Sequence, residues 1–317
     1  FEIGLILLCT CPHRFLLYLQ ALMIVVQLIG GLGNQLFQYA AAKSLSLYHE
    51  TELQLDVSSF LRTELPDLEV PRDFEMYNFK GVNERTVDVN TLVNNKEYSF
   101  LSEKRLERLL PNYKRGIYKE PFYHFDTNFF KSRKNVFLKG GWQSYKYFDK
   151  FQNNIVNALQ LKDNLIDAGE KTLYESAGSG GVVSVHVRRG DYLRKPIILE
   201  WHGIMGKEYY AEAFEQISKR STINKVLYFS DEPEWVANEL LPIMHGEIIS
   251  GKISKSQYQD FYLMQHCSHN IVANSSFSWW AAYLNPNPDK IVIAPKRWFN
   301  KAPYDTKDLI PENWIRI

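Results

Sequence analysis

The sequence predicts an α/β fold of parallel sheets, in a chain long enough for two domains. After residue 181, apolar strand-like runs alternate with helical patterns, which is typical of parallel strands joined by crossover helices. The 317 residues suit two domains of roughly 100 to 200 residues each. The stretch ESAGSGG at 175–181 is the best candidate for a linker. We therefore expect an N-terminal domain at 23–175 and a second domain at 182–317.

The first expected element is a strand that leads through a glycine turn into a helix. Residues 25–29 are apolar except for Gln27 and mostly β-branched, and a helical spacing of apolar positions runs from 36 to 48. Between them stands GGLGNQ, in which Asn34 is expected to cap the helix. Gly31 and Gly33 would let backbone amides approach a ligand at the positive end of that helix.

The remaining elements are regular only in the second half of the chain. Residues 56–135 show no clean period, and residues 138–149 predict a short strand before a helix that reaches about residue 161. The elements expected beyond the linker are strand 182–187, helix 209–219, strand 226–229, helix 233–240, a strand near 248–249, helix 257–267, strand 270–273, helix 277–284 and strand 290–294.

Residues 1–22 precede the first expected strand and are expected to form a separate N-terminal extension. Their apolar runs are interrupted by CPHR at 11–14 and are shorter than the roughly 20 residues that a membrane-spanning helix needs. We interpret them as upstream or fragmentary sequence, with a shortened signal anchor as the alternative.

Composition excludes several classes of protein. With 37 basic and 36 acidic residues, the chain lacks the basic excess of a protein that binds nucleic acid or membranes by bulk electrostatics. The three cysteines form no CxxC pair and no set with zinc spacing, so neither a disulfide framework nor a metal site is expected. No GxxxxGK[ST] motif occurs, which argues against a P-loop NTPase.

Residues suited to binding an anion follow several of the expected strands. The segments are RRGDY, SDEPEW, NSSFSWW and PKRWF. Ligands of parallel sheets bind at the carboxyl ends of the strands, so these segments are expected to converge. The guanidinium groups of Arg188 and Arg189 match phosphate oxygens, and Ser275, Ser276 and Ser278 offer hydroxyls and amides at the start of a helix.

Each of these features also has a structural explanation. Paired arginines often form surface ion pairs, serines before a helix often only cap it, and Trp279 and Trp280 are expected in the core. Asp231 either caps the following helix or accepts hydrogen bonds from the two donors on the edge of guanine, which would select guanine over adenine. The convergence of all these groups on one sheet edge favours a binding site. Asp-x-Asp, which many nucleotide-sugar enzymes use to hold a metal, is absent, so a guanidinium would have to take the metal's electrostatic role.

Four ordered motifs resemble those of the α-1,2-fucosyltransferases of glycosyltransferase family 11. They are GGLGNQLFQYA, HVRRGDY, FSDEPEW and NSSFSWWAAYL, and the resemblance covers residues 23 to about 299. It implies a GT-B architecture, in which two Rossmann-like domains face each other across a cleft. It also implies an inverting, metal-independent transfer of L-fucose from GDP-fucose to the 2-hydroxyl of a galactose-type residue of a glycan, with no cofactor.

The resemblance also implies roles for single residues. Arg188 would hold the β-phosphate, with Arg189 in support and His186 near the nucleotide through its backbone. The remaining binding residues implied are Asp231 for guanine, Ser275, Ser276 and Ser278 for the diphosphate, and Asn34, Gly31 and Gly33 from the other domain.

The acceptor hydroxyl calls for a general base, for which several residues are candidates. Asp191 is the first, His202 the second and Glu208 the third. Asp191 would alternatively pair with one of the arginines, and no strong base would be needed if departure of the leaving group leads the reaction. Side chains that could stack on sugar faces are Trp142, Tyr145, Tyr147 and Trp201, of which Trp142 and Tyr147 are equally suited to the core.

Other functions remain open on the sequence alone. One alternative is a GT-B enzyme with another donor, such as GDP-mannose or a UDP-sugar, and another is a non-catalytic GDP-sugar- or glycan-binding protein. A bacterial enzyme would be cytoplasmic or peripherally membrane-associated and act on surface polysaccharide. A eukaryotic one would serve protein glycosylation at the Golgi membrane.

Overall fold

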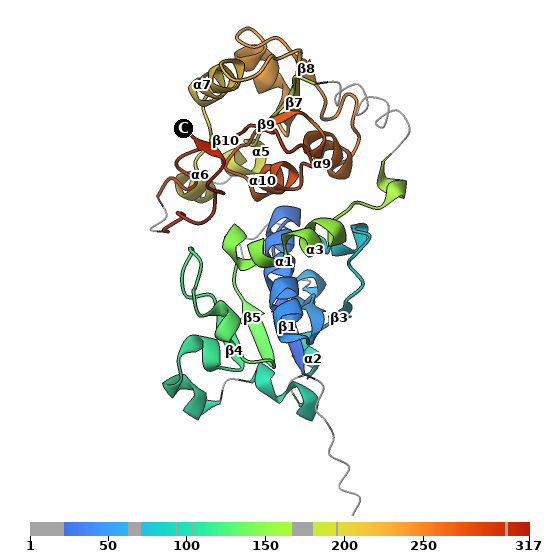
Figure 1. Ribbon diagram of the computed structural model, residues 1–317, viewed down its shortest axis with the longest axis vertical. Coiled ribbons are helices and arrows are strands. Elements are labelled where there is room, and N and C mark those ends of the chain that lie inside the picture. Colours follow the sequence, from blue (N-terminus) through green and yellow to red (C-terminus); the bar gives the residue numbers. More distant parts are fainter. Residues whose placement is uncertain are drawn as a thin grey trace, which may run out of the picture.

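The strands of the protein form two parallel sheets, one from each half of the chain (Figure 1). The computed structural model describes residues 22–62, 71–92, 94–102, 104–166, 180–194, 196–301 and 304–317. All pairings between the named strands are parallel. The predicted α/β fold of GT-B type is therefore confirmed.

The sheet of the N-terminal half has five strands in the order β3-β2-β1-β5-β4. They are β1 (Met23–Gln27), β2 (Glu52–Asp56), β3 (Arg85–Val87), β4 (Ile117–Lys119) and β5 (Val136–Lys139). The helices are α1 (Leu32–His49), α2 (Val89–Leu92) and α3 (Gln152–Ala158). Short 3₁₀ turns occupy η1 (Ser58–Leu61), η2 (Met76–Asn78), η3 (Lys96–Leu101), η4 (Arg105–Leu109), η5 (Asn112–Lys114), η6 (Phe129–Lys131), η7 (Tyr145–Tyr147), η8 (Asp149–Phe151) and η9 (Asp163–Leu165).

The sheet of the C-terminal half has six strands in the order β11-β10-β9-β6-β7-β8. They are β6 (Val182–Val187), β7 (Lys225–Ser230), β8 (Glu247–Ile248), β9 (His269–Ile271), β10 (Val292–Ala294) and β11 (Ile315–Arg316). The helices are α5 (Gly190–Arg194), α6 (Pro196–His202), α7 (Lys207–Ser218), α8 (Pro233–Trp235), the π-helix η10 (Val236–Leu240), α9 (Gln257–Gln265) and α10 (Ser276–Tyr283).

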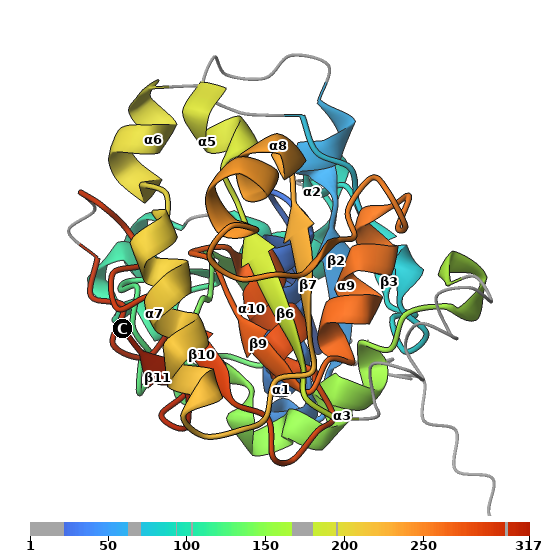
Figure 2. The ribbon, with the colours of Figure 1, turned by 90° about the horizontal axis from the view of Figure 1, so that it is seen from above.

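Helices cover both faces of the second sheet, as its buried central strands require. Along β7, Val226 and Tyr228 pack into the cluster that contains α7, whereas Leu227 and Phe229 pack into the cluster that contains α9 and α10. Figure 2 shows α7 and α9 on opposite sides of β6 and β7. The alternation of side chains along a strand therefore divides β7 between two layers of helices.

The two halves share one hydrophobic core through α1 and α10. The ring of Phe37 on α1 lies 4.5 Å from that of Trp279 and 5.1 Å from that of Trp280, between centroids. Both tryptophans are fully buried, so their expected place in the core is confirmed. Burying a large side chain of this kind stabilises a fold by roughly 1.5 to 3 kcal/mol, so this contact holds the halves together.

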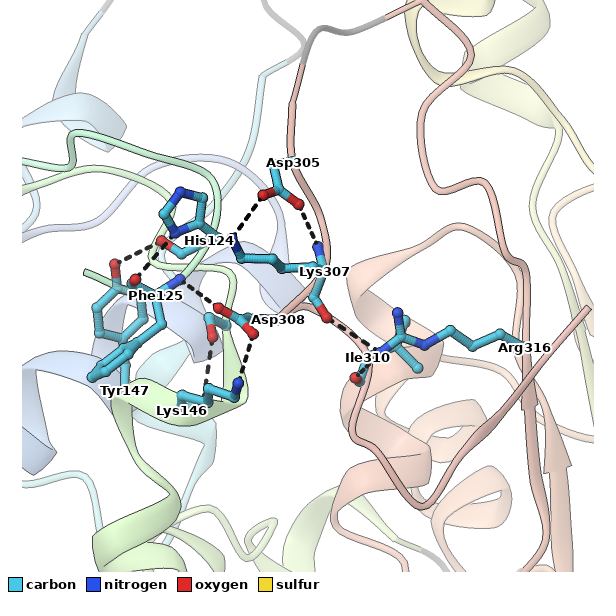
Figure 3. Close-up of polar contacts among 10 residues, drawn as sticks. His124, Phe125, Lys146, Tyr147, Asp305, Lys307, Asp308, Ile310 and Arg316 are labelled. Carbon is cyan, nitrogen blue, oxygen red and sulfur yellow. Dashed lines mark hydrogen bonds and ion pairs between the residues drawn. The ribbon is translucent and has the colours of Figure 1, made fainter. Parts of the chain in front are cut away.

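A polar contact joins the halves at a second point (Figure 3). The carboxylate of Asp308 accepts hydrogen bonds from Lys146 Nζ at 2.7 Å and from the backbone N–H of Phe125 at 3.2 Å. The hydrogen bond from Lys146 to Asp308 raises the pKa of this lysine. The loop after β4 and the turn η7 are thus tied to the C-terminal segment.

Several expectations about elements need correction. Gly31, not Asn34, stands at the N-cap of α1, and no side chain caps that helix. The helix expected to run to about residue 161 is broken into the turns η7 and η8 and the short α3. The structure adds α5 and α6, which the sequence pattern did not predict.

Some expectations lie outside the described residues. These include residues 1–21 of the extension expected at 1–22 and residues 175–179 of the expected linker, so the division at 23–175 and 182–317 stays a prediction. Within the described part, no helix is long and apolar enough to span a bilayer.

Candidate active site

A cavity of about 910 Å³ lies between the two halves, at the carboxyl ends of both sheets. Its walls are segments that follow β1, β2, β4 and β5 on one side and β6, β7, β8, β9 and β10 on the other. This is the position expected for a ligand of parallel sheets.

The N-termini of α1 and α10 meet at this cavity. A Cβ added to Gly33 would lie 2.4 Å from the backbone carbonyl carbon of Ser276, so only glycine allows this approach. Ser276 Oγ donates to Asn34 Oδ1 at 3.0 Å, and Gln143 Nε2 donates to the same oxygen at 2.9 Å. Asn34 therefore bridges the halves, and two positive helix ends adjoin one cavity.

Glu120 holds the turn that places Gln143 at the cavity. Its Oε2 accepts hydrogen bonds from the backbone N–H groups of Gly141 at 2.7 Å and Trp142 at 2.9 Å. Trp142 has φ of 53°, an unusual backbone for a bulky residue. Burial raises the pKa of Glu120 to about 7, although these two hydrogen bonds oppose the rise.

Arg188 and Asp231 form an ion pair in the cavity wall. Arg188 Nη1 lies 3.1 Å from Asp231 Oδ2, and each side chain is 26% exposed. Asp231 Oδ1 accepts the backbone N–H of Arg189 at 3.0 Å. Both oxygens of Asp231 thus hold the segment after β6, and the expected reading of guanine by Asp231 stays a prediction.

Arg189 points elsewhere. Its Nε lies 3.2 Å from Glu232 Oε2, and its guanidinium lies 4.1 Å from the centre of the Trp235 ring. Arg189 is absent from the cavity lining in the described part of the chain. The adjacent arginines therefore face different surroundings, and this geometry does not favour direct contact of Arg189 with a phosphate.

His186 presents a buried, neutral imidazole to the cavity. The residue is 6% exposed, and within the described residues its Nδ1 has no hydrogen-bond partner. Burial, followed by the charge of Arg188, lowers the pKa of His186 to about 3. Its backbone carbonyl already accepts a hydrogen bond from Tyr210 Oη at 3.2 Å, whereas the Nδ1 of its side chain has no partner among the described residues. The expected contact of its backbone with a nucleotide stays a prediction.

Two of the three expected serines line the cavity, and the third is buried beside it. Ser275 and Ser276 line the cavity at the start of α10. Ser278 is 1% exposed and donates its hydroxyl to the carbonyl of Ser275 at 3.3 Å. The expected contact of Ser278 with a diphosphate therefore stays a prediction without support from the cavity lining.

One of the candidate bases lines the cavity. His202 ends α6, and its ring stacks on that of Tyr192 with centroids 4.9 Å apart. Asp191 belongs to α5, but its side chain lies outside the part that the structure describes. Glu208 is exposed in the first turn of α7 and is not in the described cavity lining.

Aromatic rings line another part of the cavity. Tyr123 stacks on Tyr304 with centroids 4.5 Å apart, and it meets the ring of Phe299 at 5.2 Å. Phe299 in turn lies 5.3 Å from His202. Tyr123, Phe299 and His202 all line the cavity, and the Tyr123 hydroxyl donates to Gln143 Oε1 at 3.2 Å.

The side chains proposed to stack on sugars occupy other positions. Trp142 and Tyr147 are fully buried, which confirms the alternative that placed them in the core. Trp201 is exposed, with its ring 6.4 Å from that of Tyr304, and Tyr145 packs against the shared core.

Sequence reasoning missed Arg72, Tyr123 and Gln143. Arg72 lines the cavity beside Gly31, its side chain 3.8 Å from where a Cβ on that glycine would lie. Arg72 and Tyr123 belong to the stretch 56–135, where no period marks the elements, so no signal in one sequence singled them out. Gln143 lies within the stretch 138–149, for which the sequence predicted a short strand and a helix but no role for this side chain.

No group of three or more His, Cys, Asp or Glu side chains that could hold a metal ion occurs among the described residues.

Comparisons with known proteins agree on one family. The model of glycosyl transferase family 11 matches residues 6–317. The O-antigen biosynthesis glycosyltransferase WbnK of Escherichia coli is 30% identical over 308 residues, which is 92% of this chain and 99% of that protein. The alpha-1,2-colitosyltransferase of Escherichia coli is 28% identical, covering 93% of this chain and 98% of that one. Galactoside alpha-(1,2)-fucosyltransferase 1 of Ateles belzebuth is 29% identical over 57% of this chain and 52% of its own length.

Proposed function

The chain belongs to glycosyltransferase family 11 and is a glycosyltransferase, and from this premise we propose that it moves L-fucose from GDP-β-L-fucose to the 2-hydroxyl of a galactose-type residue of a glycan. The proposed transfer inverts the anomeric carbon and needs neither metal nor cofactor. The relative with the name galactoside alpha-(1,2)-fucosyltransferase supports both the donor sugar and the linkage.

One observation carries the proposal: a fixed arginine faces the cavity where two helix N-termini meet. Asp231 holds Arg188, and Gly33 lets α1 and α10 approach each other there. Cations and helix N-termini are both suited to phosphate. We infer that the diphosphate of the donor lies between Arg188 and the start of α10.

The chemistry follows from where charge develops. As the bond between fucose and GDP breaks, negative charge grows on the β-phosphate and positive charge on the sugar ring. A guanidinium already fixed beside that phosphate stabilises the transition state more than the ground state. His186, neutral at physiological pH, adds a hydrogen-bonding ring without adding charge.

The acceptor is proposed to bind against the aromatic rings. Tyr123, Phe299 and His202 line the cavity, and the apolar face of a galactose residue packs well on aromatic rings. This arrangement brings the acceptor near His202. A pH-rate profile of His202→Gln beside Asp191→Asn tests the base: the variant that lacks the base loses the rise of kcat/KM with pH, and the other keeps it.

A second donor deserves a direct comparison because one relative bears the name alpha-1,2-colitosyltransferase. Colitose is fucose without its 3-hydroxyl, so an enzyme built for fucose would donate or accept a hydrogen bond at that position. We expect kcat/KM to be higher for GDP-fucose than for GDP-colitose. A preference for GDP-colitose, GDP-mannose or a UDP-sugar would replace the donor and leave the family unchanged.

The remaining partners are proposed on indirect grounds. The near-balanced charge gives no reason to expect nucleic acid. Two of the relatives are bacterial, and one is named for O-antigen biosynthesis. These names support a bacterial surface polysaccharide as the glycan acceptor. Peripheral association with a membrane stays a prediction.

The deciding experiment is transfer itself. Release of GDP from GDP-fucose only when lactose is present would support the enzyme and dismiss a non-catalytic binding protein. Undiminished turnover in EDTA would support the absence of a metal.

A further inference from the structure

The turn η4 (Arg105–Leu109) exposes leucine side chains to an unusual degree. Leu106 is 79% exposed, Leu109 is 85% exposed and Leu110 is 40% exposed. Side chains three residues apart eclipse each other in a 3₁₀ helix, so Leu106 and Leu109 form one stripe and Arg105 and Arg108 form the next. No residue of this turn is buried.

Cations surround these leucines. Residues 104–115 contain five lysines and arginines and one acidic residue, and residues 131–134 add three more cations. The acidic residue, Glu107, is bound by Arg133 at 2.8 Å and accepts the N–H of Gly116 at 2.8 Å. The turns η5 and η6 contact each other, so the two cationic segments form one surface. We call residues 104–115 and 131–134 the basic leucine patch.

The patch lies away from the cavity. Its two segments precede β4 and β5, so they lie at the amino edge of the first sheet, whereas the cavity lies at the carboxyl edge. Figure 1 shows the turns before β4 at the end of the N-terminal half that is farthest from the C-terminal half. The net charge of the whole chain is only +1, so this local excess of positive charge does not show in the total.

We propose that the basic leucine patch docks on the surface of a bilayer that contains anionic phospholipid. Exposed leucines enter the boundary between headgroups and acyl chains, while lysines and arginines bind the lipid phosphates. Each cation near an anionic bilayer strengthens binding roughly fivefold. Docking by this edge leaves the cavity open.

The chemistry of the patch favours a bilayer over other occupants. A nucleic acid or anionic polysaccharide would satisfy the cations but offer the leucines no apolar surface. A second copy of the chain in a two-fold contact would set the same cations against each other. A bilayer with acidic headgroups satisfies both kinds of side chain at once.

Co-sedimentation of the full chain with vesicles tests the proposal, and it needs no substrate. The probes are vesicles of phosphatidylcholine alone and vesicles with about 30% phosphatidylglycerol, a proportion sufficient for a negative surface potential. We expect wild-type protein to prefer the anionic vesicles. Leu106→Ser/Leu109→Ser and Lys104→Glu/Arg105→Glu should each weaken that binding roughly tenfold or more.

Matched controls lie on the other half of the chain. Ile243→Ser replaces an aliphatic side chain that is 49% exposed, and Lys219→Glu/Arg220→Glu reverses two adjacent exposed cations. Both controls should bind anionic vesicles within twofold of wild type. All variants should keep their thermal unfolding midpoint, which shows that they are folded.

Three results would overturn the proposal. They are equal binding by patch variants and controls, equal binding of wild type to both vesicle types, and no binding at all. A dimer that the leucine substitutions dissociate would assign the patch to a second copy instead. Because vesicle binding is measured without GDP-sugar, failure of the proposed reaction leaves this result intact.

Discussion

Replacement of Arg188 by alanine, with Arg189→Ala as a matched control, tests the assignment of the cavity. Both changes remove one guanidinium from neighbouring positions of the same segment. Arg188 faces the cavity beside Asp231, whereas Arg189 lies against Glu232 and Trp235. The two variants should therefore fail in different ways.

For Arg188→Ala we expect the loss to fall on catalysis. Removal of one fixed donor to a developing negative charge costs about 3 to 4 kcal/mol, or roughly a hundredfold to thousandfold in kcat. The effect on stability should be small, because a partly exposed ion pair contributes about 0 to 1 kcal/mol.

For Arg189→Ala we expect the loss to fall on stability. The ion pair with Glu232 and the contact with the Trp235 ring together contribute about 1 to 2 kcal/mol. The unfolding midpoint should fall by a few degrees, roughly 2 to 4 °C for each kcal/mol. Turnover should stay within severalfold of wild type.

The assays are initial rates of GDP release at saturating donor and acceptor, and thermal unfolding of each variant without ligand. Near-normal kcat in Arg188→Ala, or a larger loss of kcat in Arg189→Ala than in Arg188→Ala, would refute the assignment of the phosphate to Arg188.

Three further predictions follow from other parts of the site. Gly33→Ala should cost about 1 to 3 kcal/mol of stability through overpacking against Ser276. Gly31→Ala should change the unfolding midpoint little, because the nearest atom to its added Cβ is 3.8 Å away. Equal unfolding midpoints for the two variants would contradict the close approach of Gly33 to Ser276. Since the folded pKa of His186 is about 3 and the unfolded value is 6.5, this residue costs stability as the pH falls below about 6.5, so His186→Gln should lose less stability than wild type between pH 7 and pH 5. Burial raises the pKa of Glu120 from 4.5 to about 7, so its contribution to stability is complete below about pH 4.5 and is lost as the pH rises through 7. Glu120→Gln should therefore raise the unfolding midpoint more at pH 8 than at pH 5. An equal change at both pH values would count against a buried carboxylate.

The regular part of the fold was predictable because its strands are buried on both faces. The run at 182–187 has valine at four of its six positions, and the structure shows all six residues buried in β6. Trp279 and Trp280 were predictable in the same way, since large apolar rings in a helix between two strands pack against the core.

The corrections come from contacts between distant segments. Asn34 has the residue type of a helix cap, but Ser276 and Gln143, which bind its side chain, are far away in the sequence. Arg188 and Arg189 are the same residue type, and only Glu232 and Trp235 separate their roles.

The distribution of charge over the surface could not be predicted from the totals of basic and acidic residues. The nearly equal totals of basic and acidic residues argued against a protein that binds membranes by bulk electrostatics, whereas the order of the strands gathers the cations of 104–115 and 131–134 at one edge of the first sheet. Such gathering depends on topology, which the irregular stretch at 56–135 did not reveal.

The central claim is that the cavity transfers fucose to a galactose 2-hydroxyl, and the product of one reaction tests it most directly. Purified protein is incubated with GDP-fucose and lactose in the presence of EDTA, and the trisaccharide is analysed by NMR. The account predicts an α-linked fucose on the 2-hydroxyl of galactose and stoichiometric GDP. A product with another linkage or anomeric configuration, or no transfer to any galactose-terminated acceptor, would contradict it.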